Sequence, residues 1–280
     1  MKTAFVVAGV DDITNGLAAV DRAAEEARLR GWSLRLVHVV DPKYAAGPSR
    51  GFALLQQAAV HARHHQPGLR VSTVLGLGQP ADVLLRYLDD CGLVVLGNHG
   101  HGALAGVRSS VALRLLPRVR VPVLIVRAPG LPSQRGQPSP PVVVGVDGSA
   151  GADEAVTLAA EEARLRSATL IAVHASPQPI ELDREPDPLI HGPMADQDLL
   201  DGLEVSRLHV DVDPRTALIG LSRQACLVAV GGRGRGGLTG YLLGSVGQAL
   251  IRRAECPVLI TRPTATADAV HRPALTHGRT

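Results

Sequence analysis

The chain has 280 residues, a length that favours two domains over one. With 45% hydrophobic and 20% charged residues it has an ordinary globular composition, but only 2% of its residues are aromatic. This scarcity suits parallel α/β sheets and argues against proteins that stack nucleic-acid bases on aromatic rings, and the net charge of +3 is too small to indicate a polyanionic partner.

Other sequence features bear on the cellular location of the protein. The sequence holds no stretch of about 18 apolar residues, so we expect no membrane-spanning segment and no membrane partner. The cysteines at 91, 226 and 256 form no Cys-x-x-Cys motif, and so sparse and odd a number suits a reducing compartment. The first apolar run is too short for a signal peptide. These features predict a cytoplasmic protein.

Strands and helices alternate along the first half. Apolar runs rich in Val and Leu predict strands at 3–10, 33–40, 69–75, 93–96 and 121–126. The segments between them predict helices at 15–30, 51–66, 81–89 and 110–117. The second half repeats the pattern, with strands predicted at 141–146, 168–174, 204–210, 227–230 and 258–261. Its segment 176–203 is rich in Pro and Asp, which predicts a loop with at most a short helix.

An internal repeat explains this alternation. Glu-Glu-Ala-Arg-Leu-Arg at 25–30 recurs at 161–166, and Gly-Val-Asp at 9–11 recurs at 145–147. Val-Pro-Val-Leu-Ile at 121–125 returns as Cys-Pro-Val-Leu-Ile at 256–260. The order of these matches predicts a tandem duplication. We define unit one as residues 1–127 and unit two as residues 142–262, with a Pro- and Gly-rich linker at 128–141 and a disordered tail at 263–280.

The alternation of strands and helices, with Val-rich strands, predicts that each unit is a doubly wound, five-stranded parallel sheet of the Rossmann-like or flavodoxin-like kind with right-handed crossovers. Such sheets bind ligands beyond the carboxyl ends of their strands, at the point where the strand order reverses.

The stretch 227–246 says most about function. A short apolar strand is followed by seven glycines within residues 231–244 and then by Ser245, which we expect to be the N-cap of a helix over 246–253. A glycine loop that leads into a helix N-terminus presents N–H groups and a positive dipole end, which suits a phosphate. Such loops also serve as plain strand-to-helix connections. The loop has no Lys before Ser245, so it is not a Walker A loop.

The spacing Gly231-x2-Gly234-x9-Gly244-Ser245 resembles the nucleotide-binding signature of the universal stress protein family. Gly-Val-Asp-Gly-Ser at 145–149 and the final Cys-Pro-Val-Leu-Ile strand extend this resemblance over nearly the whole chain. It implies two units paired about a pseudo-twofold axis through edge strands, a possible homodimer of the chain, and binding of ATP with or without Mg²⁺.

The resemblance also implies a set of nucleotide-binding residues in unit two. Asp147 would accept hydrogen bonds from the base or sugar region, although it could instead cap the following helix. Ala175 would lie against the adenine, and the glycines would pass the backbone beside the ribose and phosphates. The full set is Asp147, Gly148, Ala175, Gly231, Arg233, Gly234, Gly244, Ser245 and Val246.

Unit one departs from this pattern. Asp12-Ile13 stands where unit two has Gly-Ser, and the loop after Gly97 is one residue shorter, with Ser109 in a glycine position. A Cβ there would crowd a phosphate. We therefore expect weak or no binding at the corresponding residues, which are Val10, Asp11, Gly97, Gly100, Ser109 and Ser110.

Other polar residues suggest structural roles. His61 and His65 have a metal-compatible spacing but are interpreted as a solvated helix face, because no carboxylate or Cys lies near them in sequence. His38 and His174 end matching strands and are expected to be packed there. The three cysteines are expected to be small buried hydrophobes. No metal site and no catalytic residue is predicted.

The sequence thus favours a non-enzymatic, ATP-binding stress protein whose nucleotide controls an unidentified protein partner. A slow nucleotide hydrolase and a nucleotide-free dimerisation scaffold are the alternatives. The absence of a loop lysine and of an evident carboxylate pair for Mg²⁺ argues against fast phosphoryl transfer.

Overall fold

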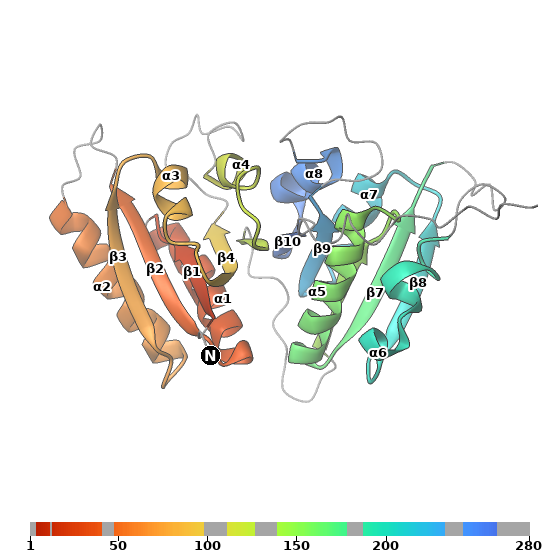
Figure 1. The fold of residues 1–280 in the computed structure, drawn as a ribbon, viewed down its shortest axis with the longest axis horizontal. Coiled ribbons are helices and arrows are strands. Elements are labelled where there is room, and N and C mark those ends of the chain that lie inside the picture. The colour runs from red at the N-terminus through yellow and green to blue at the C-terminus, as the bar shows by residue number, and fades with distance from the viewer. Residues whose placement is uncertain are drawn as a thin grey trace, which may run out of the picture.

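The computed structural model describes residues 4–11, 13–40, 48–97, 111–126, 139–177, 187–232 and 243–261. These residues form two α/β units that lie side by side (Figure 1). Most of the predicted linker and all of the predicted tail fall outside the described residues. Among the described helices, none combines the length and apolar character needed to cross a bilayer.

The described residues of unit one alternate strand and helix as predicted. Its elements are β1 (Phe5–Gly9), α1 (Ile13–Arg30), β2 (Ser33–Val40), α2 (Pro48–His65), β3 (Val71–Leu77), α3 (Pro80–Leu85), β4 (Cys91–Gly97), α4 (Val111–Leu115) and β5 (Val123–Val126).

Unit two repeats this order, except that short helices replace the counterpart of α2. Its elements are β6 (Ser139–Gly145), α5 (Ala150–Arg166), β7 (Ala168–Ala175), the 3₁₀ helix η2 (Gly192–Ala195), α6 (Gln197–Leu200), β8 (Val205–Val210), α7 (Pro214–Leu221), β9 (Leu227–Gly231), α8 (Ser245–Arg253) and β10 (Val258–Thr261). For 176–203 a loop with at most a short helix was expected, and the described part of this segment holds two short helices.

All ten strands join one sheet in the order β3-β2-β1-β4-β5-β10-β9-β6-β7-β8. Pairing is parallel within each unit, whereas β5 and β10 pair antiparallel, with Leu124 opposite Leu259. The strand order of unit two is the mirror of that of unit one. The predicted fold class and the predicted pairing of the units through edge strands are therefore confirmed.

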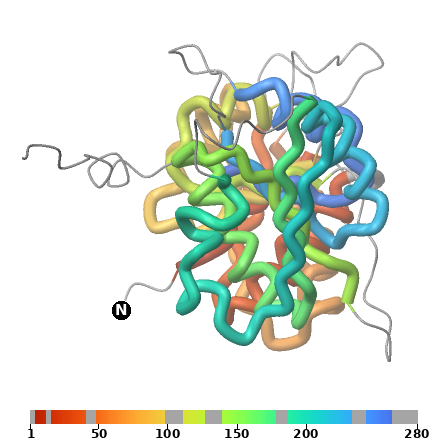
Figure 2. The backbone as a smooth tube through the Cα atoms, turned by 90° about the vertical axis from the view of Figure 1, so that its right-hand side faces the viewer, coloured from red at the N-terminus to blue at the C-terminus, as the bar shows by residue number. Residues whose placement is uncertain are grey.

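Helices cover both faces of the sheet. One core lies between the sheet and α1, α2 and α5, and the other lies between the sheet and α3, α4, α7 and α8. Figure 2 shows the sheet between these two layers from the side of unit two. Val, Leu, Ile and Ala fill both cores, as the scarcity of aromatic residues predicts.

The start of β6 differs from its prediction. Ser139 pairs with Ala168, and the register shifts before Val142 pairs with Leu170. Residues 139–141 were assigned to the linker because Pro140 and Pro141 cannot donate ladder hydrogen bonds. The structure places both prolines at the first, irregular end of the strand, where prolines are tolerated.

The exact repeat at 25–30 and 161–166 forms a buried ion-pair network between the units. Arg30 of α1 contacts Glu162 of α5, and Arg166 of α5 contacts Glu26 of α1 in the reciprocal way. Each arginine also contacts the glutamate of its own helix. The side chains of Glu26 and Glu162 are 0% and 2% exposed. Arg22, whose Nε lies 2.7 Å from Glu26 Oε1, adds a third guanidinium on one side only, because Leu158 occupies the matching place in α5.

The cysteines are buried, as predicted: Cys91, Cys226 and Cys256 are 7%, 6% and 0% exposed. Burial raises the pKa of the Cys91 thiol to about 11 and that of Cys256 to about 12, and it raises the pKa of Cys226 as well. Thiolates are therefore scarce at neutral pH.

We expect all three thiols of the folded protein to resist alkylation by iodoacetamide at pH 8, because the reactive thiolate is both scarce and covered. Mass spectrometry of the alkylated chain measures this, and the same reaction in guanidinium chloride, where all three should react, is the control. Rapid labelling of any cysteine without denaturant would contradict this expectation.

Candidate functional site

The sheet topology of unit two creates a switch point at the carboxyl ends of β6 and β9, which is called the crevice below. From β6 the chain passes through α5 to β7 on one side, while β9 lies on the other side, so the strand order reverses between β6 and β9. Ligands bind at such a point in open α/β sheets. Asp147 follows β6, and Gly231 ends β9.

Asp147 holds the turn that leads into α5. Its Oδ1 accepts hydrogen bonds from the Ser149 backbone N–H at 3.0 Å and from the Ser149 hydroxyl at 2.6 Å. Gly148 has φ of 72°, a left-handed conformation that favours glycine. Ser149 is the N-cap of α5, because its Oγ accepts from Ala152 N–H at 3.2 Å. Ser149, and not Asp147, therefore caps α5, while Asp147 orients the turn that precedes the helix.

Gly231 packs against the first turn of α5. A Cβ at this position would lie 2.6 Å from the Gly151 carbonyl carbon and 2.8 Å from the Ala152 nitrogen, both of which are backbone atoms. The buried Thr261 hydroxyl donates to the Gly151 carbonyl at 2.9 Å and closes the same corner. Close approach of β9 to α5 therefore requires glycine at 231, whatever the ligand.

Gly231→Ala is expected to destabilise the fold by about 1–3 kcal/mol, because the backbone of α5 must move to admit the methyl group. The matched control is Gly97→Ala in unit one, where a Cβ would meet only the Ala19 methyl group at 3.8 Å. Chemical denaturation measures both variants. Equal stability of the two variants would contradict this packing role.

The N-terminus of α8 is tied to the end of β9. The Gly244 N–H donates to the Gly232 carbonyl at 3.0 Å, so residues 244–246 lie beside Gly231 and Gly232 across the intervening loop. Ser245 is the first helical residue and Gly244 is the N-cap, one residue earlier than predicted, because Gly244 has a non-helical ψ of 159°. A glycine N-cap supplies no side-chain acceptor to the first N–H groups of α8. Ser245 is exposed, and Val246 is half-buried.

Of the other nucleotide-binding residues predicted in unit two, Ala175 lies within the described residues and Arg233 and Gly234 do not. Ala175 is the last residue of β7, half-buried, at the same edge of the sheet as Asp147. The Val146 N–H donates to the Val173 carbonyl at 2.9 Å, which fixes β6 against β7 at this edge.

The corresponding corner of unit one is similar only in part. The Val10 N–H donates to the Val37 carbonyl at 2.9 Å, as Val146 does in unit two, and Asp11 is exposed. Gly97 ends β4, and the described part of α4 has five residues against nine in α8. Gly100, Ser109 and Ser110 fall outside the described residues.

Two side-chain groups outside this crevice were not predicted as clusters. Asp21 of α1 places Oδ1 2.6 Å from Nε2 of His61, and His65 lies on the same turn of α2. No carboxylate lies near these histidines in sequence, as stated above, but Asp21 is close to them in space. His174, Asp187 and His209 form the second group.

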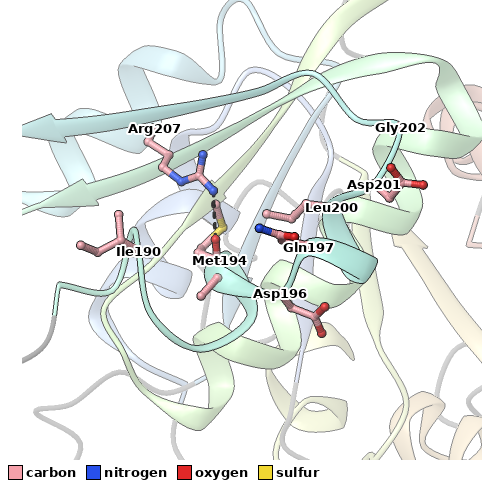
Figure 3. A pocket seen from close by; sticks show the side chains of 9 residues that line it. Ile190, Met194, Asp196, Gln197, Leu200, Asp201, Gly202 and Arg207 are labelled. Carbon is pink, nitrogen blue, oxygen red and sulfur yellow. Dashed lines mark hydrogen bonds between the residues drawn. The ribbon is translucent and has the colours of Figure 1, made fainter.

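A shallow hollow of about 530 Å³ lies elsewhere, between β8 and the segment 190–202 (Figure 3). Arg207 lies across one side of it and donates to the Met194 carbonyl at 2.9 Å. The hollow includes none of the predicted nucleotide-binding residues. Its lining consists of Ile190, Met194, Ala195, Asp196, Gln197, Leu200, Asp201, Gly202 and Arg207.

These features define a tandem pair of doubly wound α/β units with a glycine-lined crevice at one switch point. The universal stress protein family model matches residues 5–127 and 139–262. Universal stress protein Rv2005c of Mycobacterium tuberculosis is 33% identical over 285 residues, covering 92% of this chain and 96% of that protein. Universal stress protein Rv2623 of the same organism is 33% identical over 292 residues, covering 93% and 97%.

The fold also resembles that of a solved structure. The crystal structure of a universal stress protein from Archaeoglobus fulgidus aligns with a TM-score of 0.70 over 94% of this chain and 98% of that chain, at 17% identity, and so supports the fold. The chain belongs to the universal stress protein family.

Proposed function

We propose that unit two binds an adenine nucleotide, ATP in particular, and that the protein acts in stress response as a nucleotide-dependent binding protein. The observation that carries this proposal is the bond from Gly244 N–H to the Gly232 carbonyl. It holds the N-terminus of α8, which has no side-chain cap, beside the end of β9 at the switch point.

Each part of the crevice suits a different part of the nucleotide. The N–H groups of residues 244–246 and the Ser245 hydroxyl would donate to phosphate oxygens. The Asp147 carboxylate would accept hydrogen bonds from ribose hydroxyls or the adenine amino group. Ala175, at the end of β7, would contact the adenine. Arg233 and Gly234, in the loop between Gly232 and Gly244, complete the set proposed from the sequence.

The same groups favour binding over turnover. The backbone N–H groups at the N-terminus of α8 suit phosphate oxygens and cannot bind a metal ion. Mg²⁺ would therefore enter on the phosphates. A slow hydrolase remains the alternative, and enzyme assays decide between the two.

The scaffold alternative is constrained by the sheet. The edge strands β5 and β10 already pair with each other within the chain. A homodimer of the whole chain would therefore need a different surface, and a nucleotide-free role as a scaffold would rest on that surface and not on the crevice.

The experiment is mass spectrometry of the supernatant after the purified protein is denatured, followed by a turnover assay on the same preparation. About one adenine nucleotide per chain with no release of phosphate supports the proposal. Steady phosphate release would favour the hydrolase. A nucleotide-free protein that also fails to bind added ATP would leave the dimerisation scaffold as the remaining alternative.

A further inference from the structure

We propose that His174, Asp187 and His209 form a binding site for a divalent transition-metal ion of the zinc type. One potential ligand atom from each side chain lies within 4.8 Å of the other two. His209 Nε2 lies 3.1 Å from Asp187 Oδ2. None of these three residues belongs to the proposed nucleotide-binding set, although His174 directly precedes Ala175, and the proposal does not depend on the proposed function.

The two histidines are placed by the sheet. His174 and His209 are register partners on the parallel strands β7 and β8, which lie side by side at the edge of unit two (Figure 1). Register partners project from the same face of a sheet. Their rings meet edge to face, with 5.4 Å between centroids. The spacing of these two ligands is therefore fixed by backbone hydrogen bonds and not by flexible loops.

The carboxylate is placed by the segment that covers β8. The Leu189 N–H donates to Asp187 Oδ1 at 2.9 Å and orients the carboxylate, while Oδ2 faces His209. Arg207, two residues before His209, donates to the carbonyls of Leu189 and Met194, both at 2.9 Å, and anchors the segment to the strand. Asp187 is thus held in position by contacts with its surroundings.

The carboxylate is partly shielded from bulk water, because the Asp187 side chain is 18% exposed. Zinc binds carboxylates and neutral imidazoles. A carboxylate that is oriented by Leu189 N–H and shielded in this way is a suitable metal ligand.

The chemistry matches zinc coordination. Two imidazoles and one carboxylate are the ligands of open zinc sites, in which water or another small ligand fills the fourth position. Tetrahedral bonds of about 2.0–2.2 Å place ligand atoms about 3.3–3.6 Å apart, slightly more than the 3.1 Å between His209 Nε2 and Asp187 Oδ2. Metal binding would bring the other separations between ligand atoms, which are at most 4.8 Å, into this range.

Unit one provides an internal contrast. His38 matches His174, but its register partner on β3 is Leu75 and not a histidine. His38 Nδ1 instead lies 2.7 Å from the Val10 carbonyl. The cluster of Asp21, His61 and His65 is the competing site, but its carboxylate is 45% exposed and its ligands come from two surface helices. The strand-based cluster is therefore preferred.

The test is titration of the full-length, chelator-treated, nucleotide-free protein with ZnCl₂ by calorimetry and with CoCl₂ by visible absorption. We expect one preferred site per chain and the absorption of low-coordinate Co²⁺. His209→Ala and Asp187→Asn should each weaken the affinity of that site by at least about tenfold and abolish the absorption. The control variant carries both His61→Ala and His65→Ala and should retain both signals.

Circular dichroism shows that each variant is folded before titration. The proposal is overturned if the wild-type protein shows no saturable binding. It is also overturned if folded His209→Ala and Asp187→Asn proteins keep the site, or if the folded control variant loses it. Because nucleotide is absent, neither outcome affects the proposed ATP site.

Discussion

Glu26→Gln is expected to lower the free energy of unfolding by about 3–5 kcal/mol, the usual cost of removing one partner from a buried ion pair. Glu26 contacts Arg22, Arg30 and Arg166, and Glu162 would be the one buried carboxylate left in this network, because Glu25 and Glu161 are partly exposed. Because Arg166 belongs to unit two, the change also weakens the contact between the units. Denaturant unfolding of the variant and the wild-type protein at pH 7 measures this difference in the free energy of unfolding.

Two other glutamates serve as controls. Glu162→Gln should cost less, because Glu162 contacts only Arg30 and Arg166 within the network and is repelled by Glu26. Glu255→Gln breaks an exposed pair with Arg223 at 3.0 Å and should cost at most about 1 kcal/mol. A Glu26→Gln protein no less stable than Glu255→Gln would show that the network contributes nothing to stability.

The network also gives a pH dependence of known sign. Burial alone would raise the pKa of Glu26, but the charges of Arg22, Arg166 and Arg30 lower it below the ordinary 4.5. The stabilisation from Glu26 is therefore complete above about pH 4.5 and is lost as the pH falls further. Burial and the charge of Glu26 raise the pKa of Glu162, so its contribution has the opposite sign. Glu26→Gln should flatten the acid limb of the stability curve.

Gly244→Asp is expected to reduce ATP affinity by at least about 100-fold while leaving the fold intact or slightly more stable. An Asp at the N-cap would accept the hydrogen bonds of the first N–H groups of α8 and place a negative charge where a phosphate would lie. The same carboxylate interacts favourably with the helix dipole, by about 0.3–1 kcal/mol. Binding and stability should therefore change in opposite directions.

Gly244→Ser is the matched control, because it supplies a cap without a charge and should reduce affinity less. Calorimetry and thermal unfolding on the same samples measure both effects. Undiminished ATP binding by a folded Gly244→Asp protein would remove α8 from the proposed site.

Much of the fold was predictable because its signals are local. The strands at 33–40 and 258–261 were placed with their correct bounds, since each is an apolar run with clear ends. The start of β6 was missed because Pro140 and Pro141 indicate a break unless their pairing partner is known. The N-cap of α8 was predicted at Ser245, one residue too late, because Ser is more common than Gly at N-caps. In the structure the N-cap is Gly244, whose N–H donates to the Gly232 carbonyl.

The features that sequence reasoning missed depend on contacts between distant segments. The repeat identified Glu26 and Glu162, but not that the two copies meet and exchange arginines. Gly231 was interpreted through a ligand, whereas its lack of a side chain is explained by the backbone of α5. Asp21 and Asp187 gave no local signal, because each is near its histidines only in the folded chain.

Calorimetric titration of the nucleotide-free chain with ATP tests the central claim most directly. We predict one site per chain in the wild-type protein and a site at least about 100-fold weaker in Gly244→Asp, because unit two has the α8 N-terminus and the glycine loop that unit one shares only in part. Two equal sites per chain would contradict the assignment of binding to unit two, and no binding at all would contradict the nucleotide function itself.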